Sequence, residues 1–312
     1  MIFDTINTLA KKKIPFLFVS DFRLENIHVI PLDELEAWDV EYSIDENYTY
    51  TKHRHTLQKE PLNFELYQKK MAQVIEKIKS GETYLLNLTQ ATKVIPSASL
   101  QEIFKDVNAH YKLRYKDQFL CFSPEKFIQI KNNKIHTFPM KGTIDAALPN
   151  AAETILANEK EMAEHIMVVD LLRNDLSMVA SDVRVQRFRY IDTIEAGAKK
   201  LLQVSSHISG DLGEKWQERL GSILQTLLPA GSISGTPKKS TLEIIDAIEG
   251  YERGYFSGVF GVFNGESFDS GVMIRFLEKT QEGYVYKSGG GITLESDALS
   301  EYQELLDKVY LP

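Results

Sequence analysis

The spacing of apolar residues predicts five helices along the chain. Within residues 64–79, Tyr67, Met71 and Val74 recur at intervals of three and four, the period of one helix face. The last helix is expected to begin after Ser296, which can cap its N-terminus with the side-chain hydroxyl. The five predicted helices cover residues 64–79, 159–176, 220–228, 241–248 and 297–309.

Short runs rich in β-branched and aromatic residues predict strands between these helices. Asn132 and Asn133 separate two of them and predict a hairpin turn. Strands and helices do not alternate strictly, which favours an α+β fold with antiparallel pairing over a doubly wound parallel sheet. No linker, repeat or low-complexity segment divides the chain, so residues 1–312 are expected to form one domain. The predicted strands are residues 14–19, 83–88, 127–130, 134–138, 203–208, 258–263, 271–277 and 284–287.

Charge and cysteine content narrow the classes of function. The chain has 36 Lys and Arg against 44 Asp and Glu, a formal net charge of −8, which argues against nucleic-acid binding. A small anionic substrate stays possible, because a few local cations can reverse the potential inside a pocket. The single cysteine, Cys121, excludes an internal disulfide and fits a reducing cytoplasm. No segment approaches the ~20 apolar residues of a membrane span, so no membrane association is expected.

Two pairs of glutamates could hold a metal ion. Glu161 and Glu164 are three residues apart on one predicted helix, and Glu301 and Glu304 repeat this spacing on the last one. Residues at this spacing share a helix face, so two such helices could bring their carboxylates to one Mg²⁺ ion. The alternative is that each pair lies on a solvated helix face.

Two glycine-rich segments could approach an anionic ligand. In GSISGTPKKS, from Gly231 to Ser240, Ser232 offers a hydroxyl and Lys238 a positive charge before a predicted helix. In SGGGIT, three consecutive glycines that include Gly289 and Gly291 require close approach to a ligand or to a packed helix. An ordinary loop with a helix cap is the alternative for the first segment.

Two cations stand in unusual positions. Lys141, in PMKGT, follows a predicted strand and could act as a nucleophile if its amine were neutral. Arg275 lies inside the apolar run GVMIRFL, where it needs either a buried carboxylate partner or a ligand carboxylate. For Lys141 the alternative is a surface lysine at a turn.

Taken in order, five segments resemble the chorismate-binding enzymes. They are KEMAEHIMVVDLLRNDL, GSISGTPK, MIRF, SGGGI and SEYQELLDK, and the resemblance extends from about residue 64 to the end. It implies a single α+β fold with two large antiparallel sheets and outer helices, like that of anthranilate synthase component I. It further implies a Mg²⁺ ion in a central cavity, with residues 1–60 as a shortened N-terminal part of the same fold.

The resemblance also implies roles for individual residues. Glu164 and Glu304 match magnesium ligands, while Glu161 and Glu301 match carboxylates that hold metal-bound water or lie near the departing group. Lys141 and Glu161 are expected to be catalytic, and Glu301 is expected at the metal together with Glu164 and Glu304. The expected substrate-binding residues are Thr143, Ser232, Lys238, Arg275, Gly289 and Gly291.

Two positions favour one reaction within the family. Members that use water carry a lysine where this chain has Leu85, which cannot activate water. Lys141 replaces the small residue that anthranilate synthases carry and matches the aminodeoxychorismate branch, in which ammonia replaces the C4 hydroxyl of chorismate on the way to 4-aminobenzoate and folate. Leu85 departs from the glutamine that is usual in ammonia-using members. Gln203 stands where many members have a histidine linked to pyruvate elimination, which fits an enzyme that keeps the enolpyruvyl group.

The nitrogen source is expected to involve a partner. Cys121 lies in the apolar run FLCFSPEKF and lacks the glycine-flanked turn of a nucleophile, so the chain alone should not hydrolyse glutamine. A glutamine amidotransferase subunit would then supply ammonia in a heterodimer. The alternatives are an anthranilate synthase component I and, more remotely, a non-catalytic chorismate-binding partner.

Overall fold

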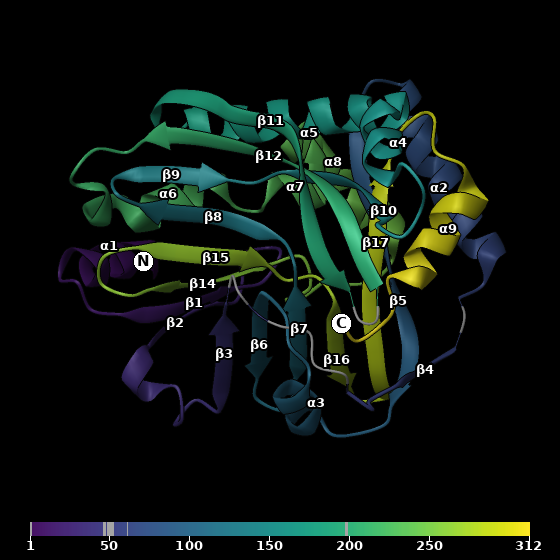
Figure 1. The fold of residues 1–312 in the computed structure, drawn as a ribbon. Helices are drawn as coiled ribbons and strands as arrows, with labels where there is room; N and C mark the ends of the chain where they lie inside the picture. Colours follow the sequence, from purple (N-terminus) through teal and green to yellow (C-terminus); the bar gives the residue numbers. More distant parts are fainter. Residues whose placement is uncertain (1, 46–47, 49–52, 61, 197–198) are drawn as a thin grey trace.

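The computed structural model places two antiparallel sheets across one another, with helices around them (Figure 1). It describes residues 2–45, 48, 53–60, 62–196 and 199–312. Within these ranges one sheet has nine strands and the other has eight, and every strand pairing is antiparallel. The expected α+β class, with two antiparallel sheets in a single domain, is therefore confirmed.

The strands of the nine-stranded sheet are, in spatial order, β10 (Met140–Asp145), β12 (Lys199–Asp211), β9 (Lys134–Thr137), β8 (Lys126–Lys131), β15 (Phe268–Val272), β14 (Val259–Phe263), β1 (Phe16–Ser20) and β2 (Ile27–Pro31). Strand β11 (Ser181–Ala196) pairs with β12. The strands of the eight-stranded sheet are, in spatial order, β13 (Gly235–Thr236), β5 (Leu85–Pro96), β17 (Gly283–Ile292), β16 (Phe276–Thr280), β7 (Phe119–Ser123), β6 (Tyr111–Tyr115) and β3 (Val40–Ile44). Strand β4 (Leu57–Glu60) pairs with β5. The first 60 residues contribute strands to both sheets.

Helices cover the outer faces and include the predicted ones. In Figure 1, α2 and α9 lie beside β5 and β17. Helix α8 packs against β5 and β13 of the eight-stranded sheet, and α5 packs against β10, β11 and β12 of the nine-stranded sheet. No helix in the described ranges combines the length and the apolar character that a bilayer crossing requires. The helices are α1 (Ile2–Lys11), α2 (Phe64–Lys79), α3 (Leu100–Asp106), α4 (Ala151–Ala157), α5 (Glu159–Ser177), α6 (Leu220–Leu227), α7 (Gly231–Ser234), α8 (Lys238–Glu249) and α9 (Ala298–Asp307).

Strand β1 explains why some strands are apolar at every position. Its residues alternate between two cores: Phe16 and Phe18 pack with the helices, while Leu17 and Val19 pack against the second sheet. Successive side chains of a strand point to opposite faces, so a strand that is covered on both faces reads as a continuous apolar run.

Two local predictions are wrong. Residues 271–277 do not form one strand, because the chain turns between β15 and β16, where Arg275 has a φ of 54°. The cap of α9 is Asp297, whose side chain accepts a hydrogen bond from the backbone N–H of Ser300. Ser296 instead donates its hydroxyl hydrogen to Glu301 Oε1 over 2.8 Å.

A buried ion pair connects α8 to the strands around the centre of the molecule. Arg253 and Glu249 have side chains that are 2% and 1% exposed, and Arg253 Nη2 lies 2.6 Å from Glu249 Oε1. Arg253 also donates hydrogen bonds to the carbonyl oxygens of Asn87, in β5, and Ile233, in α7. One guanidinium therefore joins α8, β5 and α7.

Replacing this arginine should destabilise the protein strongly. In Arg253→Met the carboxylate of Glu249 stays buried without a partner, which costs about 3–5 kcal/mol of unfolding free energy. Chemical denaturation measures the change. The matched control is Arg184→Met, because Arg184 pairs with Asp182 at the surface, where ion pairs contribute little. Equal stabilities for the two variants would contradict this role of the buried pair.

Candidate active site

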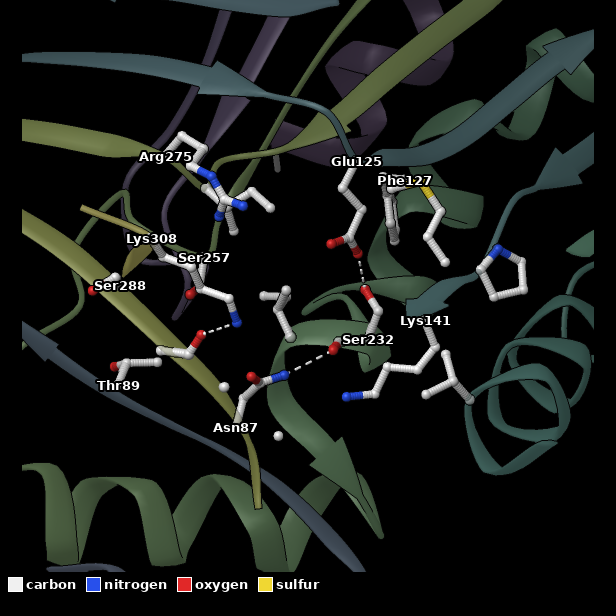
Figure 2. Close-up of a pocket in the computed structure, with 18 of the residues that line it drawn as sticks. Asn87, Thr89, Glu125, Phe127, Lys141, Ser232, Ser257, Arg275, Ser288 and Lys308 are labelled. Carbon is white, nitrogen blue, oxygen red and sulfur yellow. Dashed lines mark hydrogen bonds between the residues drawn. The ribbon is translucent and has the colours of Figure 1, made fainter. Parts of the chain in front are cut away.

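A cavity of about 170 Å³ opens where the two sheets meet. Its walls come from β5 and β17 on one side and from the segments before β8 and around β10 on the other, with α5 and α7 closing it. In Figure 2, Lys141, Lys308 and Arg275 point into it from different sides, with Glu125 between them. A site with several cations and a buried carboxylate suits an anionic ligand.

Lys141 lies in β10 and meets a carboxylate of α5. Its Nζ is 2.6 Å from Glu164 Oε2. Burial lowers the pKa of Lys141, but the charges of Glu164, Glu304 and Glu161 raise it further, so the amine is held protonated. The residue type and the cavity fit a nucleophile, while the ion pair has to open before the amine can react.

The glutamate pairs of α5 and α9 lie next to the cavity rather than in its lining, with Glu164 and Glu304 against the lining lysines. Glu164 and Glu301 are buried, and Lys160 Nζ lies 4.0 Å from a carboxylate oxygen of each. Glu304 Oε1 is 2.7 Å from Lys308 Nζ. Lysines therefore balance the charges that the helices α5 and α9 bring together, as buried charges require.

The chemistry of these carboxylates fits a hard divalent cation. Among the described residues, no three acidic or histidine side chains are close enough to hold a metal ion as they stand. However, Glu301 Oε2 and Glu304 Oε1 lie 3.4 and 3.9 Å from the point that a Cβ on Gly290 would occupy, so the glycine leaves space beside both. Burial raises the pKa of Glu161 and that of Glu301, which is the electrostatic cost that a cation would offset. Oxygen donors of this type are those that Mg²⁺ prefers.

Arg275 lies at the other end of the cavity, in the turn between β15 and β16 rather than inside a strand. Its guanidinium carbon is 5.4 Å from the centre of the Tyr310 ring. Its Nε is buried and has no hydrogen-bond partner in the described part of the chain. A buried donor without a partner is costly, and a ligand carboxylate would satisfy it.

Glu125 is a site residue that the sequence patterns did not reveal. It follows β7, lines the cavity, and accepts a 2.6 Å hydrogen bond from the hydroxyl of Ser232. Burial raises the pKa of Glu125, although the Ser232 hydrogen bond and the cations Arg275 and Lys308 oppose the shift. The sequence does hold one indication of Glu125, because it is a charged residue between two apolar strands. It lies far along the chain from the other motifs, so no spacing connects it to them.

The glycines of β17 bring its backbone against several neighbours. A Cβ on Gly289 would lie 2.5 Å from the Leu88 carbonyl oxygen, in the neighbouring strand β5. A Cβ on Gly291 would lie 3.1 Å from Leu85 Cδ1 and 3.7 Å from Lys141 Nζ. Close packing therefore explains part of this motif, and the rest of it lines the cavity.

Two of the substrate-binding residues expected from the sequence, Lys238 and Thr143, do not line the cavity. Lys238 Nζ instead donates to the Leu227 carbonyl oxygen and lies 3.5 Å from Asp175 Oδ2. Thr143 is exposed on β10 and is opposite Gln203 in the register with β12. Ser232, Arg275, Gly289, Gly291 and Lys141 line it, as does Leu85.

Cys121 is fully buried in β7, outside this cavity. Its Sγ donates a hydrogen bond to the carbonyl oxygen of Ile274, and burial raises the pKa of the thiol well above its usual range. A thiol that stays protonated and inaccessible is a poor nucleophile.

Comparisons with known proteins agree with this architecture. Residues 21–311 match the family model described as chorismate binding enzyme. The chain is 47% identical to an uncharacterized PabA-like protein of Haemophilus influenzae, over 99% of this chain and 95% of that one. It is 34% identical to aminodeoxychorismate synthase component 1 of Escherichia coli, over 78% of this chain but only 56% of that protein.

A solved structure shows the same fold. Anthranilate synthase component I from Streptococcus pneumoniae superposes with a TM-score of 0.71 at 20% identity, covering 97% of this chain and 84% of that one. The similarity to the fold, the family match and the sequence relatives confirm the resemblance seen in the sequence. The chain belongs to the chorismate-binding enzyme family.

Proposed function

We propose that this protein is the synthase subunit of an aminodeoxychorismate synthase, which converts chorismate and ammonia to 4-amino-4-deoxychorismate. The observation that carries the proposal is Lys141, an amine that lines the cavity beside Leu85. Leu85 has no group that can deprotonate water, so a reaction initiated by water is disfavoured. The identity to aminodeoxychorismate synthase component 1 of E. coli supports the same reaction.

Chorismate carries two carboxylates, and the cavity offers donors for both. Arg275 provides the unpaired Nε donor at one end. Ser232, Gly289 and Gly291 line the wall between that end and Lys141. Binding the substrate at both ends would hold its ring over the amine of Lys141, where proximity lowers the barrier to attack.

Lys141 attacks C2 of the bound ring once its ion pair with Glu164 has opened and its ammonium group has lost a proton to solvent. The C1–C2 electron pair moves to C1–C6, the C5–C6 pair moves to C4–C5, and the C4–O bond breaks. Glu125 is the group suited to protonate the departing hydroxyl, because burial favours its neutral form. Ser232 donates to Oε1 of Glu125, which leaves Oε2 to carry the proton.

Ammonia then attacks C4 and completes the exchange. The two electron pairs return to their original positions, and the bond from C2 to the Lys141 nitrogen breaks, so the lysine leaves as an amine. The Glu125 carboxylate takes up the proton that the new C4 ammonium releases. Gln203 carries no acid–base group, which fits a product that keeps its enolpyruvyl ether.

Glu164, Glu304 and Glu301 are the residues that would hold Mg²⁺ in this enzyme, with Glu161 beside them. When bound, the ion would neutralise the carboxylate of chorismate next to C1 and stabilise charge that develops on the ring. The four glutamates would position it, in place of the lysines that now pair with three of them.

Removing the proposed nucleophile should abolish amination but not binding. Lys141→Ala is expected to lower the rate of aminodeoxychorismate formation by at least about three orders of magnitude, because no covalent adduct can form. Chorismate binding, followed by calorimetry, should stay measurable. The exposed Lys239→Ala serves as the control, and intact-mass spectrometry of the wild-type enzyme should detect a lysine adduct. Unchanged turnover in Lys141→Ala would refute the covalent mechanism.

Changing a proposed metal ligand should remove the response to magnesium. Glu304→Gln keeps the size of the side chain but loses its charge, so activity should fall to background while the fold persists. In a thermal melt with chorismate, added Mg²⁺ should raise the unfolding temperature of the wild type and of the exposed Glu295→Gln control, but not of Glu304→Gln. Full turnover in EDTA would rule out the metal.

The nitrogen donor gives an independent test of the subunit role. The buried thiol of Cys121 is unsuited to glutamine hydrolysis, so the purified chain should use ammonium salts but not glutamine. Adding a glutamine amidotransferase subunit should confer glutamine-dependent activity. Product formation from glutamine by the chain alone, lost in Cys121→Ser, would instead make Cys121 catalytic.

A further inference from the structure

Strand β5 presents an amide to the cavity beside the proposed nucleophile. Leu85, Asn87 and Thr89 alternate along the strand and all line the cavity. Asn87 Nδ2 donates a 2.9 Å hydrogen bond to the carbonyl oxygen of Ser232, which fixes the orientation of the amide (Figure 2). Its Oδ1 has no hydrogen-bond partner among the described residues, so it is an acceptor that is free to bind a ligand.

Strand pairing brings this amide close to Lys141. Asn87 is directly opposite Gly291 in the register between β5 and β17. Residues opposite each other in an antiparallel pair project to the same face, with Cβ positions about 5 Å apart. Lys141 Nζ lies 3.7 Å from the Cβ position of Gly291, and Leu85 Cδ1 lies 3.1 Å from it. The amide of Asn87, the amine of Lys141 and the methyl of Leu85 therefore surround one small space; Figure 2 shows Asn87 and Lys141 at the cavity.

We infer that Asn87 Oδ1 forms an ammonia subsite: it accepts a hydrogen bond from the incoming ammonia and directs the nitrogen lone pair toward the substrate. This inference rests on the proposed amination of chorismate. Ammonia has three donors and one lone pair, so an acceptor behind it orients the lone pair forward. The neighbouring Thr89 hydroxyl is less suited, because it already contacts Glu249 and Tyr251.

The amide also explains a preference for ammonia over water. Attack by water from this subsite needs a base beside the water to remove a proton, and neither the amide of Asn87 nor the methyl groups of Leu85 can act as one. Ammonia needs no such base before it attacks. In this step the C4–N bond forms as the C2–N bond to Lys141 breaks, and the released proton passes to Glu125 rather than to the amide.

Two substitutions at Asn87 separate the acceptor from the brace to Ser232. Asn87→Leu removes both, whereas Asn87→Asp keeps an acceptor but loses the donor to Ser232. With chorismate saturating, Asn87→Leu should raise the KM for ammonia about tenfold, the loss of roughly one hydrogen bond. For Asn87→Asp the KM for ammonia should stay within about threefold of the wild-type value, because an acceptor is kept. The control is Thr92→Val, on the same strand but outside the cavity, which should leave the KM for ammonia unchanged.

A purely structural role would give a different pattern. If the brace to Ser232 were the function of Asn87, both variants would lose kcat equally and the KM for ammonia would not change, and this result overturns the inference. An unchanged KM for ammonia in Asn87→Leu also overturns it. The proposed function is judged separately: if the wild-type enzyme forms no aminated product, that function fails, whatever the variants do.

Discussion

The site depends on compensating several buried charges around one lysine. Lys141 lies 2.6 Å from Glu164, and the charges of Glu161 and Glu304 reach it as well. Buried carboxylates and buried ammonium groups are tolerated only when they are paired with one another. The chain must therefore hold α5 and α9 at fixed positions relative to β10. This constraint links the fold to the chemistry, because the residues whose charges balance one another are also the residues suited to bind the substrate and the metal ion.

The glycines of β17 allow these charged groups to meet. Side chains on Gly289 or Gly291 would collide with β5 or fill the space beside Lys141, and one on Gly290 would occupy the space beside Glu301 and Glu304. The buried pair of Arg253 and Glu249 holds β5 and α7 from behind. The glycines of β17 therefore leave room for the cavity, and the buried ion pair of Arg253 and Glu249 keeps its walls in place.

The sequence predicted the long helices closely and the irregular segments poorly. The helices expected over residues 64–79 and 159–176 are Phe64–Lys79 and Glu159–Ser177, because apolar periodicity persists over several turns. The turn at Arg275 was missed, since a positive φ leaves no mark in a pattern of apolar residues. Sequence spacing also could not predict where the side chain of Lys238 points; in the fold it points toward Asp175.

The candidate site was predictable only in part, for a related reason. Motifs of several residues, such as the glutamate pairs, carry a spacing that can be read along the chain. Glu125, between β7 and β8, and Asn87, on β5, are single residues far apart in the sequence, and tertiary packing alone brings them to Ser232. The resemblance to the family supplied the roles of the motifs, whereas the structure was needed to find these two residues.

The most direct test of the account is the identity of the product. The purified protein would be incubated with chorismate, Mg²⁺ and ¹⁵N-labelled ammonium, and the products analysed by mass spectrometry. The account predicts one labelled product that has gained an amine in place of the C4 hydroxyl and has kept its enolpyruvyl group, with no pyruvate released. Labelled anthranilate with an equal amount of pyruvate, or an unlabelled isomer of chorismate as the main product, would contradict it.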